Sequence, residues 1–249
     1  RRGERFGPFL LLYGLAHGGV SQIHRARYLG RVNVPEVVVK RLREPYNDDP
    51  DFVQMLTDEA ELMHRLRHPN IAHVLEFGHV GQQYFLATEY VDGINLHQML
   101  RRLRRTQKLM RIEVALFVMT ESLSGLNYAH QFERSLVHRD FTPSNLMLSF
   151  DGAVKLIDFG IAKSRLARTK TRAGVIKGKL KYMSPEQTRG SRVTLRSDVF
   201  SAGVVAYQCL TGRLPFNGET DAEIIEKIRG MTVEPASFYN AGIDDALDD

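Results

Sequence analysis

Apolar and polar residues alternate differently in the two parts of this chain. In the N-terminal part, short apolar runs broken by glycines have the period of strands, which we expect at residues 9–16, 21–28, 34–42, 71–77 and 83–89. Between them, apolar residues at helical spacing predict a helix over residues 51–67. It should end before Pro69, because proline disfavours helical backbone in the residue that precedes it.

Beyond residue 92 the apolar spacing becomes helical, over residues 96–105, 111–131, 198–210 and 221–229. We therefore expect a small sheet with one helix in residues 1–91 and a larger, mainly helical part in residues 92–249. Strands followed by helices predict an α+β fold in two unequal parts.

The composition is that of an ordinary globular protein, with 43% hydrophobic and 25% charged residues among 249. Its apolar runs are too short to cross a membrane. Because the chain begins with Arg1 and has no leader pattern, we expect it to be a piece of a longer protein. The single cysteine, Cys209, excludes an internal disulfide framework, and its apolar surroundings favour a buried, unreactive thiol.

Positive charge is concentrated in two segments. Residues 161–181 contain eight basic residues and no acidic one, whereas the C-terminal residues 244–249 are acidic. A second basic cluster, on the helix expected at 96–105 and just after it, consists of Arg101, Arg102, Arg104, Arg105 and Lys108. No aromatic residues alternate with these charges for base stacking, which disfavours nucleic acid as the partner. An acidic protein substrate or partner is the alternative.

Four short motifs carry the candidate chemistry. Lys40 follows three valines, His138-Arg139-Asp140 is followed by Asn145, and further on come Asp158-Phe159-Gly160 and Ser184-Pro185-Glu186. Their order and spacing resemble those of protein kinases, most closely the bacterial serine/threonine kinases. The resemblance extends from about residue 9 to the end of the chain.

This resemblance implies a bilobal kinase-like fold. Residues 1–91 would be the N-lobe, a small antiparallel sheet with one main helix, and residues 92–249 a mainly helical C-lobe. Members of the family usually continue with two further helices, so we expect the C-lobe to be incomplete. The implied activity is transfer of the γ-phosphate of ATP to protein serine or threonine, with Mg²⁺ or alternatively Mn²⁺.

The same resemblance assigns a nucleotide site. Lys40 would hold the α and β phosphates and pair with Glu59 on the first helix. The family's glycine-rich loop keeps only its middle glycine, Gly18, because Ala16 and Ser21 stand at the outer two positions. The remaining residues assigned to nucleotide are Gly19, Ile23, Val38, Glu89, Val91 and Met147. Glu89 and Val91 would bind the adenine through their backbone groups.

In the catalytic loop, the resemblance gives Asp140 the role of orienting the acceptor hydroxyl and taking its proton. Asn145 and Asp158 would hold metal ions, since hard oxygen ligands suit Mg²⁺. His138 would pack against Phe159 in the hydrophobic interior. Arg139 beside the catalytic aspartate is typical of kinases whose activation segment is ordered by a phosphate.

Two positions depart from the family pattern in a reciprocal way. Serine/threonine kinases usually have lysine two residues after the catalytic aspartate, and this chain has Thr142 there. The position after Gly178 is usually threonine, and here it is Lys179. We expect Lys179 to reach back to the catalytic site and to restore the missing positive charge, as a catalytic residue. The alternative is that Lys179 faces solvent within a basic segment.

Phosphorylation of the activation segment, residues 160–184, is expected at Thr169 or Thr171, with Ser164 a weaker candidate. The added phosphate would pair with Arg139 and nearby lysines.

Three readings remain open. The chain is an active protein kinase, a pseudokinase that binds nucleotide or partners without transferring phosphate, or a small-molecule kinase of related fold. Thr142 also weakens the distinction between serine/threonine and tyrosine as acceptor. For this piece we expect a cytoplasmic location and no membrane contact, with ATP and protein as its partners; dimerisation is left open.

Overall fold

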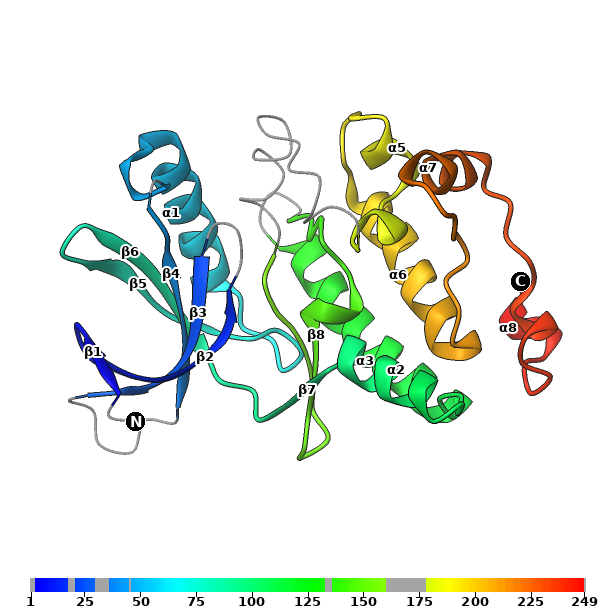
Figure 1. Cartoon of the computed structure of the whole chain (residues 1–249), viewed down its shortest axis with the longest axis horizontal. Helices are drawn as coiled ribbons and strands as arrows, with labels where there is room; N and C mark the ends of the chain where they lie inside the picture. The colour runs from blue at the N-terminus through cyan, green and yellow to red at the C-terminus, as the bar shows by residue number, and fades with distance from the viewer. Residues whose placement is uncertain are drawn as a thin grey trace. The chain divides into compact units, whose positions relative to one another are not determined.

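The computed structural model describes residues 3–17, 21–29, 36–44, 46–132, 136–159 and 178–248. Only the backbone is described at His17, Asp51, Met55, Glu59 and Asp245. The chain forms two compact units, unit 1 with residues Arg1–Asp92 and unit 2 with residues Gly93–Asp249 (Figure 1).

Unit 1 is built on a six-stranded antiparallel sheet with the strand order β1-β2-β3-β4-β6-β5. The strands are β1 (Glu4–Phe6), β2 (Phe9–His17), β3 (Ser21–Tyr28), β4 (Val37–Leu42), β5 (Val74–Val80) and β6 (Gln83–Glu89). Helix α1 (Pro50–Arg65) packs against β5. It begins where the Asp49 carboxylate accepts a hydrogen bond from the Phe52 amide, with Pro50 in its first turn.

The apolar face of this sheet explains its stability. Val37 and Val39, two residues apart in β4, are both fully buried, and their β-branched side chains suit a pleated strand. Phe9 meets the ring of Phe85 edge-on, with centroids 5.2 Å apart, inside the same cluster. Val38, between the two buried valines, therefore faces the opposite side of the sheet.

Unit 2 is mainly helical, with a small three-stranded sheet in the order β7-β8-β9. Its strands are β7 (Gly93–Asn95), β8 (Leu146–Ser149) and β9 (Val154–Leu156). Its described helices are α2 (Leu96–Arg105), α3 (Ile112–Gln131), α5 (Pro185–Thr188), α6 (Leu195–Thr211), α7 (Asp221–Gly230) and α8 (Asp245–Asp248). Helix α3 packs against both α6 and β9.

The sequence pattern predicted the longer elements well and the short ones poorly. The bounds predicted for β3, β6 and α2 are confirmed. The first helix ends at Arg65 rather than residue 67, because Leu66 already has extended backbone (φ −71°, ψ 127°). The following strand accordingly begins at Val74 and not at residue 71. Strands β1, β7 and β8 were not predicted, since three or four residues are too few to show a period.

Among the described residues, no helix is both long enough and apolar enough to cross a membrane.

Candidate functional site

In unit 1, the sheet register gathers several of the predicted nucleotide-site residues. Ala16 lies opposite Ile23, and Ile23 lies opposite Lys40. Residues directly opposite in an antiparallel pair share a face, and so do residues two apart, which adds Val38. Ala16, Ile23, Val38 and Lys40 therefore lie on one face of the sheet, away from the buried valines. Lys40 does not end its strand, because β4 continues for two more residues, to Leu42.

The segment predicted to contact the adenine follows the same sheet. Glu89 ends β6, lies opposite Val37, and donates its backbone N–H to the carbonyl of His73 at 2.9 Å. Val91 is buried. The backbone path here is thus fixed by sheet pairing.

Two parts of the predicted nucleotide site cannot be placed. Gly18 and Gly19 lie outside the described residues, and for Glu59 only the backbone is described, on α1. Ser21, the other glycine replacement, is buried at the start of β3. The pairing of Lys40 with Glu59 therefore remains a prediction.

In unit 2, Asp198 fixes the backbone that leads to Asp140. This α6 carboxylate, 1% exposed, accepts the amides of His138 and Arg139, both at 2.7 Å. The ring Nε2 of His130, from α3, lies 2.8 Å from the same carboxylate. A buried carboxylate is stable only when it is paired and hydrogen-bonded, and here it receives all three contacts from two distant segments.

Gln187 also holds this backbone, and the sequence analysis did not predict that role. Its side-chain amide donates to the carbonyl of Arg139 at 3.1 Å, while its own oxygen accepts the amide of Ser184. Arg139 has φ 66°, in the left-handed region that a non-glycine residue adopts only when neighbouring groups enforce it. Asp198 and Gln187 supply that constraint on the peptide just before Asp140.

Two further side chains, those of Asn145 and Lys179, contact Asp140. The amide nitrogen of Asn145 donates to the Asp140 carbonyl at 2.7 Å and to its Oδ2 at 3.0 Å. The ammonium of Lys179 forms an ion pair with the same Oδ2. The carboxylate is 10% exposed, so these contacts fix its orientation.

Lys179 thus reaches Asp140, as expected, rather than facing solvent, whereas its catalytic role remains a prediction. It directly precedes the turn Leu180–Tyr182, whose Leu180 and Tyr182 are buried. The hydroxyl of Ser201 on α6 donates to the Tyr182 carbonyl at 2.7 Å and holds that turn. Thr142 is 4% exposed, and its hydroxyl has no hydrogen-bond partner among the described residues.

Thr142 and Lys179 also line one pocket, of about 470 Å³, which we call the Lys179 pocket. Ser144, Lys181 and Arg104 line the same pocket. Lys179 thus connects the pocket to the carboxylate of Asp140 with which it pairs, and all the lining residues belong to unit 2.

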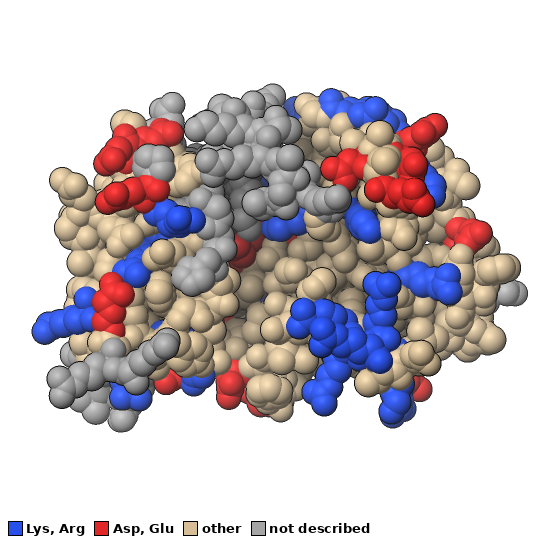
Figure 2. Space-filling model, viewed as in Figure 1, with Lys and Arg blue, Asp and Glu red and all other residues tan. Residues whose placement is uncertain are grey.

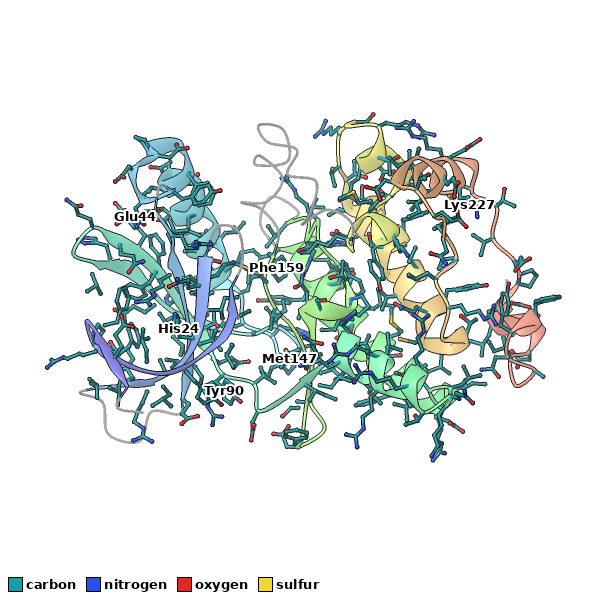
Figure 3. The ribbon with its side chains drawn as sticks, in the orientation of Figure 1. His24, Glu44, Tyr90, Met147, Phe159 and Lys227 are labelled. Atoms are coloured by element: carbon teal, nitrogen blue, oxygen red, sulfur yellow. The ribbon has the colours of Figure 1, made fainter. Side chains whose placement is uncertain are left out.

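The candidate metal ligands lie close together. The amide of Ile157 donates to the carbonyl of Asn145 at 2.9 Å, so Asp158 follows directly on a residue bonded to Asn145. Asp158 itself has φ 59°, which marks a sharp change of chain direction after β9. The ring of His138 packs against Phe159 with centroids 4.4 Å apart, as predicted. Met147 lies in β8, opposite Lys155 of β9, and Phe159 follows β9; Figure 3 labels both side chains.

The described residues contain no group of three or more His, Cys, Asp or Glu side chains arranged to hold a metal ion. Asn145 and Asp158 offer two oxygen ligands. Magnesium in nucleotide sites is typically bound by one or two protein oxygens, with phosphate and water completing the shell. The residues present therefore fit a metal ion that arrives with nucleotide.

Cys209 provides a stability probe away from the site. It is 0% exposed in α6, and burial raises the pKa of its thiol to about 12. Because the thiolate is the reactive form, we expect no labelling by iodoacetamide at neutral pH in the native protein and complete labelling in denaturant. Peptide mass spectrometry measures both. Rapid labelling of native protein would contradict the buried placement.

Comparison with known proteins gives a consistent result. Residues 15–241 match the family described as the protein kinase domain. Tyrosine-protein kinase MasK of Myxococcus xanthus is 39% identical over 93% of this chain and 37% of that protein. Serine/threonine-protein kinase PrkC of Bacillus subtilis is 31% identical over 97% of this chain and 36% of that protein. This chain spans little more than a third of the length of these curated relatives.

Among solved structures, the kinase domain of Mycobacterium tuberculosis PknI is similar with a TM-score of 0.71. The similarity covers 99% of this chain and 86% of that chain, at 24% identity. The predicted α+β, kinase-like fold is confirmed, as is the resemblance to bacterial serine/threonine kinases.

Proposed function

Because this chain belongs to the protein kinase domain family, we propose that it transfers the γ-phosphate of Mg-ATP to serine and threonine hydroxyls of proteins. The observation that carries the proposal is the environment of Asp140. Its carboxylate is oriented by Asn145 and Lys179, on a backbone held by Asp198 and Gln187. A carboxylate held in this way suits acceptance of a proton from a hydroxyl.

We assign roles as follows. The nucleotide supplies the phosphoryl group and, with its metal ion, neutralises charge on the phosphates. Lys40, on the sheet face opposite the buried valines, holds phosphate oxygens, with Ala16, Ile23 and Val38 beside the nucleotide. Those four share a sheet face, which supports the assignment.

Asp140 orients the acceptor hydroxyl and takes its proton. Asn145 has a double role, because its amide nitrogen positions Asp140 while its oxygen is a metal ligand together with Asp158. Lys179 supplies the positive charge beside the transferring phosphoryl group that serine/threonine kinases usually take from the position of Thr142. A fixed cation at the site of developing charge is an efficient stabiliser.

We infer serine/threonine rather than tyrosine specificity, although one relative is named a tyrosine-protein kinase. The restored lysine is the feature of serine/threonine kinases that Thr142 alone would remove. Phosphorylation of Thr169, Thr171 or, less favourably, Ser164 is proposed to activate the enzyme by pairing with Arg139; all three lie outside the described residues. We place the activity in the cytoplasm, where ATP is available.

Phosphoamino-acid analysis tests this proposal. With γ-labelled ATP, Mg²⁺ and a generic basic or acidic protein acceptor, we expect phosphoserine and phosphothreonine, and loss of transfer after removal of divalent metal by EDTA. Re-addition of Mg²⁺ or Mn²⁺ then compares the two ions. Phosphotyrosine alone would contradict the acceptor assignment. ATP binding without any transfer would instead support the pseudokinase reading.

A further inference from the structure

The basic cluster on α2 has no role in the chemistry described above. Arg101, Arg104 and Arg105 have the i, i+3, i+4 spacing of one helix face, and Lys108 follows in the turn after α2. All four side chains are exposed, whereas Leu96 and Leu100 of the same helix are buried; Arg104, four residues after Leu100, adjoins this buried stripe. We call these four residues the α2 ridge. Figure 2 shows basic side chains gathered over this part of unit 2.

The charge of the α2 ridge is not neutralised within the described part of the chain. No carboxylate there forms an ion pair with any of its residues. Residues 96–112 contain no acidic residue. One or two cations at a helix C-terminus stabilise the helix dipole, but like charges three or four residues apart repel one another. A ridge of this density is therefore best explained by an anionic ligand.

The ridge is continuous with the Lys179 pocket. Arg104 belongs to both, because it lines the pocket together with Lys179 and Lys181. Lys179 in turn pairs with Asp140, to which the proposed function brings the acceptor hydroxyl. A polypeptide whose hydroxyl reaches Asp140 therefore has a path along which its neighbouring residues meet Arg104 and then the rest of the ridge.

The pocket lining also contains acidic residues. Glu219, just before α7, and Asp221, its first residue, line the pocket together with Arg104 and Lys179. An acidic side chain of a substrate would be repelled by these two carboxylates and attracted to the basic residues. The charges of the lining therefore favour placement of acidic substrate residues toward Arg104 and the ridge.

We propose that an acidic segment of the substrate protein, adjacent to the acceptor serine or threonine, binds along the α2 ridge. Arginine suits this role, because its planar guanidinium binds carboxylates through two parallel hydrogen bonds. A peptide, unlike a flat bilayer, can extend from the ridge into the pocket. The inference rests on the proposed function and adds the class of substrate to it.

Paired peptides test the inference. Both carry the same acceptor serine, flanked in one by a run of glutamates and in the other by glutamines. We expect kcat/KM to be about tenfold higher for the glutamate peptide at low salt, through KM, with the difference falling as salt is added. The double variant Arg101→Glu/Arg105→Glu should lose the preference and keep its rate on the glutamine peptide.

The matched control is Arg192→Glu/Arg196→Glu, which makes the same charge change at exposed arginines outside the ridge and the pocket. It should keep the preference for glutamate. Thermal melting of both variants checks that the fold is intact. An equal preference in wild type and ridge variant would overturn the inference. So would ridge-dependent binding to phosphatidylserine vesicles with unchanged peptide preference.

Binding separates this inference from the proposed function. Calorimetric titration with the glutamate peptide requires no catalysis. If the wild type binds the glutamate peptide, the ridge variant does not, and the wild type transfers no phosphate, the ridge inference is supported and the kinase proposal is refuted. Transfer to both peptides with no difference in affinity refutes the ridge and leaves the kinase proposal standing.

Discussion

The variant Asp140→Asn is expected to lower kcat for phosphate transfer by about 10²–10⁴-fold, the range found for loss of a positioned general base. Asparagine has nearly the shape of aspartate, so the contact with the Asn145 amide nitrogen through the remaining oxygen is retained. What is lost is the charge that accepts the proton and that pairs with Lys179. Initial rates at saturating ATP and acceptor measure kcat directly.

The control for this variant is Asp151→Asn, an exposed carboxylate in the turn between β8 and β9 of the same unit. Its rate should equal that of the wild type. ATP affinity, measured by calorimetry, should change little in either variant, because the effect belongs to the chemical step. A wild-type rate for Asp140→Asn would contradict the assignment of this residue.

The second large effect concerns Lys179. Lys179→Ala is expected to lower kcat by about 10²-fold, comparable to removal of one fixed charge-stabilising group from an active site. The ion pair with Asp140 places the ammonium next to the reacting groups, within a partly enclosed pocket where electrostatic interactions are stronger than in water. Lys227→Ala, an exposed lysine on α7 that binds the Asn217 carbonyl, is the control.

A double substitution tests the swap itself. Thr142→Lys/Lys179→Thr recreates the arrangement usual in serine/threonine kinases, and it should recover most of the activity that Lys179→Ala loses. Thr142 is buried at the wall of the Lys179 pocket, so a longer side chain there points toward available volume. Activity no better than that of Lys179→Ala would show that the two positions are not interchangeable. An unchanged rate in Lys179→Ala would refute the swap.

The sequence allowed prediction of the contacts that depend on residue identity. The pairing of Lys179 with the catalytic segment followed from two complementary departures from a family pattern, and His138 against Phe159 followed from the same pattern. The unreactive environment of Cys209 followed from its apolar helix. In each case the residue type limited the possible partners.

Contacts that depend on exact register, or on a side chain whose type gives no signal, were not predictable. Gln187 lies 48 residues from the Arg139 carbonyl that it binds, and a glutamine has no periodic or charge signal to mark it. The alignment of Ala16, Ile23 and Lys40 across three strands depends on the bulges in β2, which shift the register between Leu11 and Ala16. Such information becomes available only with the folded backbone.

The geometry of unit 2 explains why the site depends on the whole unit. The Asp140 carboxylate is oriented by groups from the catalytic loop and from the segment before α5, and its backbone by α5 and α6. Each support comes from a separate element, so the position of Asp140 is determined only when unit 2 is folded. Precise placement of this kind is what catalysis by positioning requires.

Mass spectrometry after incubation with Mg-ATP and an acceptor protein tests the central claim most directly, because it reports transfer and the modified side chains together. We predict that wild-type protein adds phosphoryl groups to serine or threonine, and that Asp140→Asn adds none in the same time. Absence of transfer by folded, ATP-binding wild type, or equal transfer by both proteins, would contradict the account.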